Sequence, residues 1–225
     1  TIMGGRPVLN EDLVNLPNWL VLKLRIEGED AIRLSNVEIL SYRHIYDIRT
    51  ATVMRKVRFR DRKGRETTLH SRRFVSMAHR HQGGLSWTIT AENWSGRIEL
   101  VSALDGRMTN RAVARYRELE GRHLDPVSPR TFSADTIALK VQTRQSDIYI
   151  AQAARTQVFY EGEQDCLDVE RDLYQMEDYI QQVLTFDVTQ GTPMRVEKLV
   201  AMFTARDDAI TEPLAAAGRH VVRYP

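Results

Sequence analysis

Hydrophobic and polar residues alternate most regularly between residues 69 and 96. In the second half of this segment, apolar side chains take the odd positions and polar side chains the even positions. The apolar residues are Leu85, Trp87, Ile89 and Ala91, and the polar residues are Ser86, Thr88, Thr90 and Glu92. A period of two is typical of a strand with one buried face. Gly83 and Gly84 can adopt the positive φ of a tight turn, so we predict a hairpin with residues 67–78 over residues 79–84. This hairpin is expected at the centre of a β-structure, with Trp87 in the core.

Further short alternating segments follow along the chain, separated by turn-forming residues. We predict strands at 19–26, 36–40, 44–49, 52–61, 65–78, 96–105, 136–143, 147–157, 179–189 and 194–204. Segments 52–61 and 65–78 are expected to form one hairpin, and segments 179–189 and 194–204 a last one. Short strands with frequent turns indicate an all-β fold, in which two large antiparallel sheets pack face to face.

Two internal segments have the spacing of short helices instead. One would begin at Asn110 as its N-cap and stop at Gly121. The other is the acidic stretch 161–178, where apolar side chains recur at three- and four-residue intervals. That interval predicts an exposed helix.

The tail from Asp207 is expected to form another short helix. Thr211 would cap it, Pro213 would lie in its first turn and Gly218 would end it. The sequence contains no internal repeat and no low-complexity linker. We therefore predict one β-sandwich domain over residues 1–206, followed by the start of a linker helix over residues 207–225.

Composition restricts the class of protein. The chain has 225 residues, of which 42% are hydrophobic and 28% charged, and its formal net charge is +2. This balance supports a sizeable core and does not by itself indicate nucleic acid or a membrane as a partner. The single cysteine, Cys166, excludes an internal disulfide framework and fits a reducing compartment. With no signal-peptide layout and no apolar run near the roughly 20 residues that span a bilayer, we expect a cytoplasmic protein.

A run of positive charge stands out near the first predicted hairpin. Seven cations fall within eleven residues: Arg55, Lys56, Arg58, Arg60, Arg62, Lys63 and Arg65. Such a run can bind phosphate or nucleic acid. A solvated strand face is the better interpretation, because Val57 and Phe59 would point inward and no aromatic residues alternate with the cations. We predict no nucleic-acid partner.

Few residues suggest chemistry. His79 and His81 could begin a metal site, but no third ligand lies within reach in the sequence, so we predict no metal. The sequence has no nucleophile elbow, no phosphate-binding glycine loop ahead of a helix and no Cys/His pairing. Paired carboxylates for glycoside chemistry cannot be recognised by spacing, because the fold sets their separation. We predict no catalytic residue and no cofactor in this chain.

One group of residues is a candidate for carbohydrate binding. Arg72, Arg73, Glu92 and Asn93 could bind sugar hydroxyls or a phosphate, and Trp94 could stack on a sugar ring. The alternative for each residue is structural: ion pairs between neighbouring strands, with Trp94 packed under a loop.

Six segments together resemble a known family. They are LNEDLVNLPNWL (9–20), SRRFVSMAHRH (71–81), ENWSG (92–96), SALDGRMTN (102–110), VARYRELEGRHLDP (113–126) and VEKLVAMFTARDDAI (196–210). The chain is similar, over nearly its whole length, to the N-terminal β-sandwich domain of glycoside hydrolase family 65. That family includes maltose, trehalose and kojibiose phosphorylases and acid trehalases.

The resemblance implies a supersandwich that precedes a linker helix and an (α/α)₆ barrel. In the family the barrel carries the general-acid glutamate and the phosphate site, and inorganic phosphate attacks the anomeric carbon with inversion. None of that barrel is in this chain, so we expect one inactive domain of a longer enzyme that acts on an α-linked disaccharide. The domain is expected to pack on its own barrel, to support a homodimer and to lend the loop 92–95 to the rim of the substrate pocket.

Three other functions stay open at this point. A free-standing carbohydrate-binding module would show an exposed row of aromatic side chains. A nucleic-acid-binding domain would use the cations of residues 55–65 in a salt-sensitive way. A mutarotase-like sugar enzyme would gather a carboxylate and histidines on one concave face.

Overall fold

The computed structural model describes residues 2–3, 6–7, 14–110, 121–208 and 212–223 of the chain. These residues form fourteen strands and one helix. They are β1 (Ile2–Met3), β2 (Arg6–Pro7), β3 (Asn18–Ile26), β4 (Glu38–Asp47), β5 (Thr52–Arg60), β6 (Glu66–Val75), β7 (Gln82–Ala91), β8 (Gly96–Asp105), β9 (Leu124–Ser133), β10 (Thr136–Thr143), β11 (Tyr149–Tyr160), β12 (Glu170–Met176), β13 (Tyr179–Val188), β14 (Met194–Thr204) and α1 (Pro213–Arg223).

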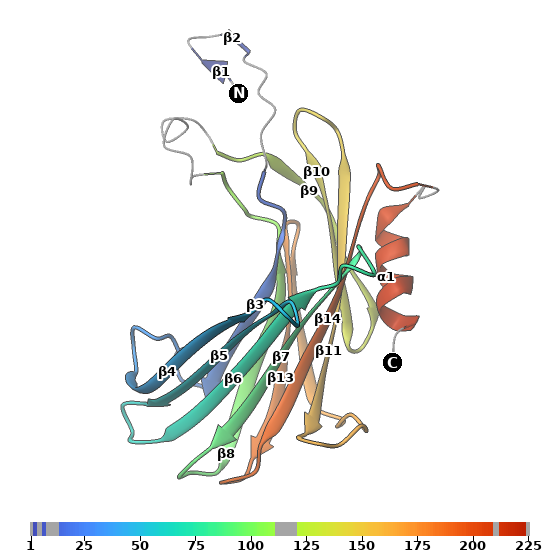
Figure 1. The fold of residues 1–225 in the computed structure, drawn as a ribbon. Coiled ribbons are helices and arrows are strands. Elements are labelled where there is room, and N and C mark those ends of the chain that lie inside the picture. Colours follow the sequence, from blue (N-terminus) through green and yellow to red (C-terminus); the bar gives the residue numbers. More distant parts are fainter. Residues whose placement is uncertain (1, 4–5, 8–13, 111–120, 209–211, 224–225) are drawn as a thin grey trace.

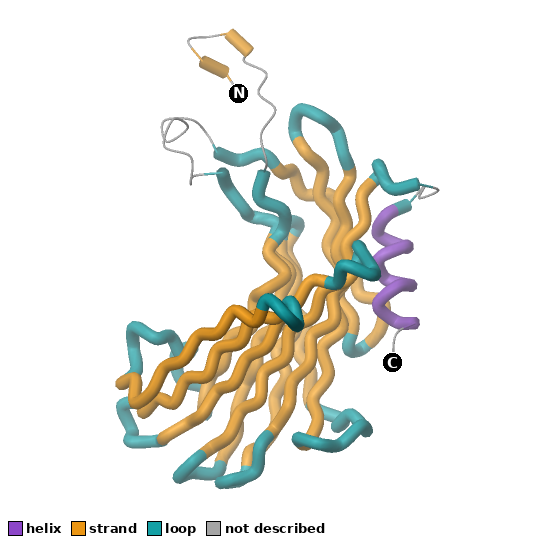
Figure 2. Tube along the Cα trace, viewed as in Figure 1, coloured by secondary structure: helices purple, strands orange, loops and turns teal. Residues whose placement is uncertain are grey.

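Two antiparallel sheets face each other and form the body of the molecule (Figures 1 and 2). The larger sheet has eight strands in the order β4-β5-β6-β7-β14-β11-β10-β9, and the smaller has four in the order β12-β13-β8-β3. Strands β1 and β2 form a separate pair. The predicted all-β fold with two antiparallel sheets is confirmed.

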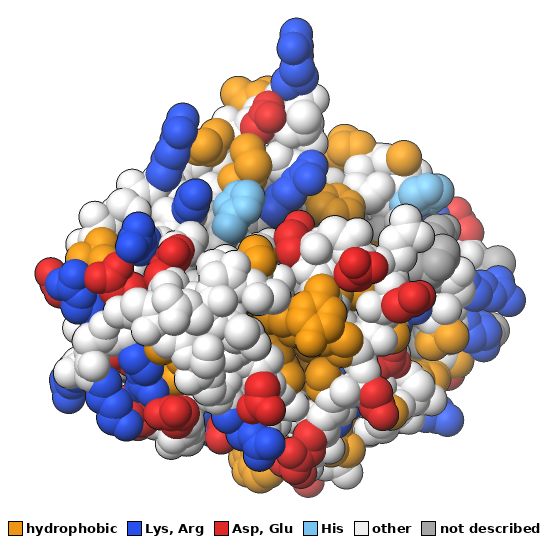
Figure 3. All heavy atoms as spheres, turned by 90° about the horizontal axis from the view of Figure 1, so that it is seen from below, with side chains coloured by type: hydrophobic (Ala, Val, Ile, Leu, Met, Phe, Trp, Pro, Cys, Tyr) orange, Lys and Arg blue, Asp and Glu red, His pale blue; other side chains and the backbone are white. Residues whose placement is uncertain are grey.

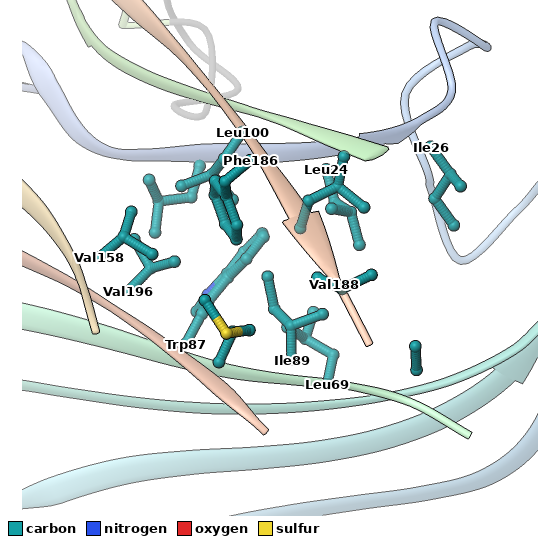
Figure 4. Close-up of a cluster of buried hydrophobic side chains, with 14 of the residues drawn as sticks. Leu24, Ile26, Leu69, Trp87, Ile89, Leu100, Val158, Phe186, Val188 and Val196 are labelled. Carbon is teal, nitrogen blue, oxygen red and sulfur yellow. The ribbon is translucent and has the colours of Figure 1, made fainter. Parts of the chain in front are cut away.

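The hydrophobic core fills the space between the sheets (Figure 4). Leu69, Trp87 and Ile89 come from the larger sheet and meet Leu100 and Phe186 of the smaller one. Each of these side chains contributes about 1.5–3 kcal/mol when it leaves water. Trp87 is only 8% exposed, so its predicted place in the core is confirmed.

The central hairpin is also confirmed, because β6 pairs with β7 in the middle of the larger sheet. Its glycines serve a different purpose from the one predicted. Gly83 and Gly84 lie inside β7, and neither has a positive φ. A Cβ atom would lie 3.2 Å from the Trp19 ring at Gly83 and 2.6 Å from the Phe74 ring at Gly84. Glycine is favoured here because two aromatic rings pack closely on the strand.

The predicted helix over residues 161–178 is wrong. Residues 170–176 form β12, which pairs with β13 at the edge of the smaller sheet. Val169 and Leu173 are four residues apart, an interval that fits a strand as well as a helix. The segment forms a strand rather than a helix because it pairs with the edge of β13, which satisfies the hydrogen-bonding groups of its backbone.

The predicted last hairpin is wrong as well. Both strands exist, but β13 belongs to the smaller sheet and β14 to the larger one. The connection 189–193 therefore crosses from one layer to the other. Length and turn residues alone do not distinguish this crossing from a hairpin.

Two strand predictions also differ from the structure. Segments 36–40 and 44–49 are one strand, β4, whose register shifts between Ile39 and Ser41. Strand β9 is missing from the predicted strands, and it contains Pro126 and Pro129. Proline cannot donate to a neighbouring strand, and β9 tolerates two because it lies at the sheet edge.

Helix α1 packs on the outer face of the larger sheet, against Ala151 and Ala153 of β11. Gly218 does not end the helix, which continues to Arg223. A Cβ atom at Gly218 would overlap the ring of Phe132, so this glycine permits close packing.

The side chain of Glu212 accepts a hydrogen bond from the Ala215 amide at 2.6 Å and caps the helix. The predicted cap, Thr211, lies outside the described residues. The predicted helix over residues 110–121 also lies outside them, except at its two ends.

Candidate functional site

The predicted carbohydrate-binding residues lie in two separate places. Arg72 and Arg73 are near the end of β6, whereas Glu92, Asn93 and Trp94 follow β7 beside the start of β6. Five residues of extended strand, roughly 17 Å, separate the two groups. Consecutive strand residues also point to opposite faces, so Arg72 is exposed on the outer face and Arg73 lies on the inner one. The structure does not bring the five residues together.

Trp94 is buried, and its neighbours are structural. The ring is 7% exposed, and its Nε1 donates to the Glu66 carbonyl oxygen at 3.0 Å and to Thr67 Oγ1 at 3.1 Å. Asn93 Oδ1 accepts from the Glu66 amide at 2.7 Å, and the Glu92 carboxylate accepts from Thr68 Oγ1. These contacts tie the residues after β7 to the start of β6.

Most cations of the run 55–65 are matched by carboxylates. Arg58 and Arg60 lie on the outer face of β5 and each bind Glu66 at 2.7 Å, and Arg60 also binds Glu38 at 2.9 Å. Figure 3 views the molecule from below, and at its left side basic and acidic side chains intermingle. Mixed signs favour a solvated face over a nucleic-acid surface.

The Arg65 cluster lies at the turn of this hairpin. We use this name for Arg65 with Asp61, Glu27 and Glu29, whose carboxylates lie 2.6, 2.7 and 2.9 Å from its guanidinium nitrogens. The guanidinium also lies 5.6 Å from the centre of the Trp94 ring. Burial alone would raise the pKa of Asp61, but hydrogen bonds and charge from Arg65 hold that pKa below its usual value.

The two candidate metal ligands sit near α1. His81 stacks on Phe203 with ring centres 3.9 Å apart, and its Nδ1 lies 2.8 Å from the Met202 carbonyl oxygen. His220 of α1 meets both rings edge-on. Among the described residues, no group of three or more His, Cys, Asp or Glu side chains is arranged to hold a metal ion.

Lys198 lies between the sheets and was not singled out from the sequence. It is 1% exposed, and its Nζ donates to the carbonyl oxygens of Ala103 at 2.7 Å and Val21 at 3.2 Å. Burial lowers the pKa of this lysine to about 7. The contacts join β14 to β3 and β8 across the core, which makes Lys198 a structural link between the two layers.

A trough opens between β3 and the inner face of the larger sheet. It consists of two adjoining hollows of about 230 and 180 Å³ that share Leu22, Arg55 and Trp87. His44 and Arg73 line the second hollow. We call these hollows the inner-face trough. The sequence held one signal for it, because Arg55 has the same strand parity as the buried Val57 and Phe59.

Comparisons with known proteins identify the family. Residues 2–224 match the family model described as glycosyl hydrolase family 65, N-terminal domain. An uncharacterized glycosyl hydrolase of Mycobacterium tuberculosis H37Rv is 40% identical over 96% of this chain and 16% of its own length. A kojibiose phosphorylase of Caldanaerobacter subterraneus is 33% identical over 66% of this chain and 19% of its own length.

A solved structure shares the fold. A candidate kojibiose phosphorylase from the human microbiome superposes with a TM-score of 0.70 at 13% identity, over 92% of this chain and 24% of its own. The chain thus spans less than a quarter of the length of each of these three proteins. No helix in the described part of the chain is long and apolar enough to cross a membrane. The match over residues 2–224 shows that the chain belongs to glycosyl hydrolase family 65, of which it is the N-terminal domain.

Proposed function

We propose that this chain is the non-catalytic N-terminal domain of an enzyme that cleaves an α-linked disaccharide, by inverting phosphorolysis with inorganic phosphate as co-substrate. The observation that carries the proposal is the family match over residues 2–224, together with relatives named as kojibiose and trehalose phosphorylases. The contacts of Glu92, Asn93 and Trp94 add support, because they tie the residues after β7 to β6.

The domain's roles in the longer enzyme follow from the same proposal. It packs against the catalytic (α/α)₆ barrel, with residues 207–225 starting the linker, and supports a homodimer in the cytoplasm. A contribution to the rim of the substrate pocket stays a prediction. The buried ring of Trp94 argues against this side chain as the sugar contact. Light scattering on the longer enzyme, with and without this domain, tests the homodimer.

Phosphorolysis tests the proposed activity. Trehalose, maltose, kojibiose and nigerose are incubated with the longer enzyme or with this 225-residue chain, with and without phosphate. We expect phosphate-dependent cleavage of one disaccharide by the longer enzyme and none by this chain. Cleavage without phosphate would identify a hydrolase. Cleavage by the 225 residues alone would refute the non-catalytic role.

A further inference from the structure

Two arginines on the inner face of the larger sheet have no carboxylate partner. Arg58, Arg60 and Arg65 of the same hairpin are each bound to carboxylates within 3 Å. Within the part of the chain that the structure describes, the guanidinium groups of Arg55 and Arg73 form no hydrogen bond and no ion pair. Both residues are of intermediate exposure and are not on the fully solvated outer face.

The strand register holds these two arginines close together. Arg55 of β5 pairs with Ser71 of β6, and Arg73 lies two residues further along β6 on the same face. Such diagonal neighbours are about 7 Å apart. β5 lies between β4 and β6, and His44 of β4 pairs directly with Arg55. All three line the second hollow, and neither hollow has an Asp or Glu in its wall.

The walls of the trough strengthen the effect of these charges. Leu20, Leu22, Leu85 and Trp87 form its apolar side. A low-dielectric wall focuses the field of nearby charges and favours a counter-ion in the hollow. Without an anion, the two guanidinium groups are like charges on neighbouring strands and repel each other. The trough is therefore built to receive a negative charge.

The number and shape of the donors favour a phosphate ester. Guanidinium groups bind phosphate and carboxylate oxygens in a two-pronged geometry. A carboxylate brings one negative charge, whereas a phosphate monoester brings roughly 1.5–2 near pH 7. Two arginines match the larger charge better, and the ring nitrogens of His44 lie beside them as further polar groups.

An aromatic row lies next to the arginines. Tyr42, His44 and Tyr46 follow one another along the inner face of β4, with ring centres 6.4 and 4.7 Å apart. The tyrosines are 49% and 67% exposed, and β4 is the edge strand of the larger sheet. Such rings offer a flat apolar face and a hydroxyl group to a small polar ligand. This is the exposed aromatic row that a carbohydrate-binding surface requires.

We propose that the inner-face trough binds a hexose phosphate, with the phosphate group on Arg55 and Arg73 and the sugar ring extending from the trough over the neighbouring row of Tyr42, His44 and Tyr46. The phosphate part rests on the geometry alone, whereas the choice of a sugar also rests on the proposed function. The site lies on this domain and involves no step of disaccharide cleavage.

Titration calorimetry of this chain tests the site, with intrinsic tryptophan fluorescence as a second signal, because Trp87 lines both hollows. The probes are glucose 1-phosphate, glucose 6-phosphate, inorganic phosphate and glucose. We expect a hexose phosphate to bind and each of Arg55→Met and Arg73→Met to weaken it about tenfold. Tyr42→Ala with Tyr46→Ala should weaken the hexose phosphate several-fold and leave inorganic phosphate unchanged.

The matched control uses two cations on the outer face of neighbouring strands. Arg43 and Lys56 pair across β4 and β5, and the double variant Arg43→Met/Lys56→Met should bind like the original chain. An equal loss in the control and in the trough variants would overturn the proposal, as would no binding of any phosphate by the original chain. Inorganic phosphate binding as tightly as both hexose phosphates would overturn the sugar part.

Circular dichroism separates loss of binding from loss of folding. Each variant counts only if its spectrum and melting temperature match those of the original chain or exceed them. The outcome is also independent of the proposed function, which is tested by cleavage in the longer enzyme. Failure of hexose phosphate to bind would leave that activity standing, and failure of cleavage would leave the phosphate site standing.

Discussion

The two ends of the β5–β6 hairpin hold positive charge in opposite ways. At the turn, Arg65 is buried and bound to three carboxylates, with the Trp94 ring beside it. At the open end, Arg55 and Arg73 lie side by side on the inner face with no carboxylate in the walls around them. At the turn end the arginine is paired with carboxylates, whereas at the open end the two arginines have no carboxylate partner among the described residues.

If the proposed site binds its ligand, this difference distinguishes a structural arginine from a binding arginine. A cation that serves the fold acquires its counter-ions when the chain folds, because leaving it unpaired costs stability. A cation kept for a ligand stays unpaired until the ligand arrives, and the free protein is less stable for it. Lys198 shows a third outcome, since a fully buried amine with only carbonyl partners has its pKa lowered to about 7.

The largest effect is expected at the turn end. Arg65→Met leaves the carboxylate of Asp61, whose side chain is 6% exposed, without its cation. We expect the free energy of unfolding to fall by about 3 kcal/mol, measured by urea denaturation. Lys63→Met is the control, because its exposed ammonium group should contribute less than about 1 kcal/mol. Equal losses in the two variants would mean that the Arg65 cluster is not a buried structural unit.

The next effect concerns pH and Lys198. In the unfolded chain this lysine keeps its proton up to about pH 10.4, but in the folded chain only up to about pH 7. The unfolded state therefore binds more protons between these values, so stability should rise with pH by up to about 1.4 kcal/mol per unit. Lys198→Met should remove this rise, measured as the free energy of unfolding at pH 7 and pH 9. The same slope in both proteins would show that Lys198 is charged in the fold.

A smaller effect tests whether Trp94 has a structural role, like Arg65, or contacts a ligand. Trp94→Phe keeps an aromatic ring but removes the Nε1 donor to the Glu66 carbonyl oxygen and Thr67 Oγ1. We expect a loss of about 1 kcal/mol in the free energy of unfolding and no change in the KM of the longer enzyme. A raised KM with unchanged stability would instead place Trp94 at the substrate pocket.

The smallest effect has the opposite sign. Arg55→Met removes one of two neighbouring like charges, so the free energy of unfolding should rise by about 0.5 kcal/mol. A hexose phosphate should raise the melting temperature of the original chain more than that of the variant at the same ligand concentration. If Arg55→Met destabilised the chain as a structural arginine would, the contrast between the two ends of the hairpin would disappear.

The all-β class and most strands could be predicted from alternation alone. A strand with one buried face has to place apolar side chains at every second residue, as Leu85, Trp87 and Ile89 do. The same rule shows that Val57 and Phe59 point inward and that Lys56 and Arg58 point outward. These are local properties, which is why the sequence carries them.

Which strands pair with each other could not be predicted from the sequence in the same way. Residues 170–176 become a strand because β13 has a free edge, and β13 and β14 separate because each pairs with a different sheet. Periodicity describes which face of a segment is apolar, but it does not state which segment lies beside it.

The candidate site shows this limit most clearly. The sequence by itself determined that Arg72, Arg73, Glu92, Asn93 and Trp94 are polar or aromatic groups of the predicted central hairpin, and that Arg55 belongs to a basic run. Only the tertiary structure buried Trp94 and joined Arg55 to Arg73, which are eighteen positions apart. The physical reason is that a strand's own residues set its faces, whereas register and layer packing decide which faces meet and which charges remain without a partner.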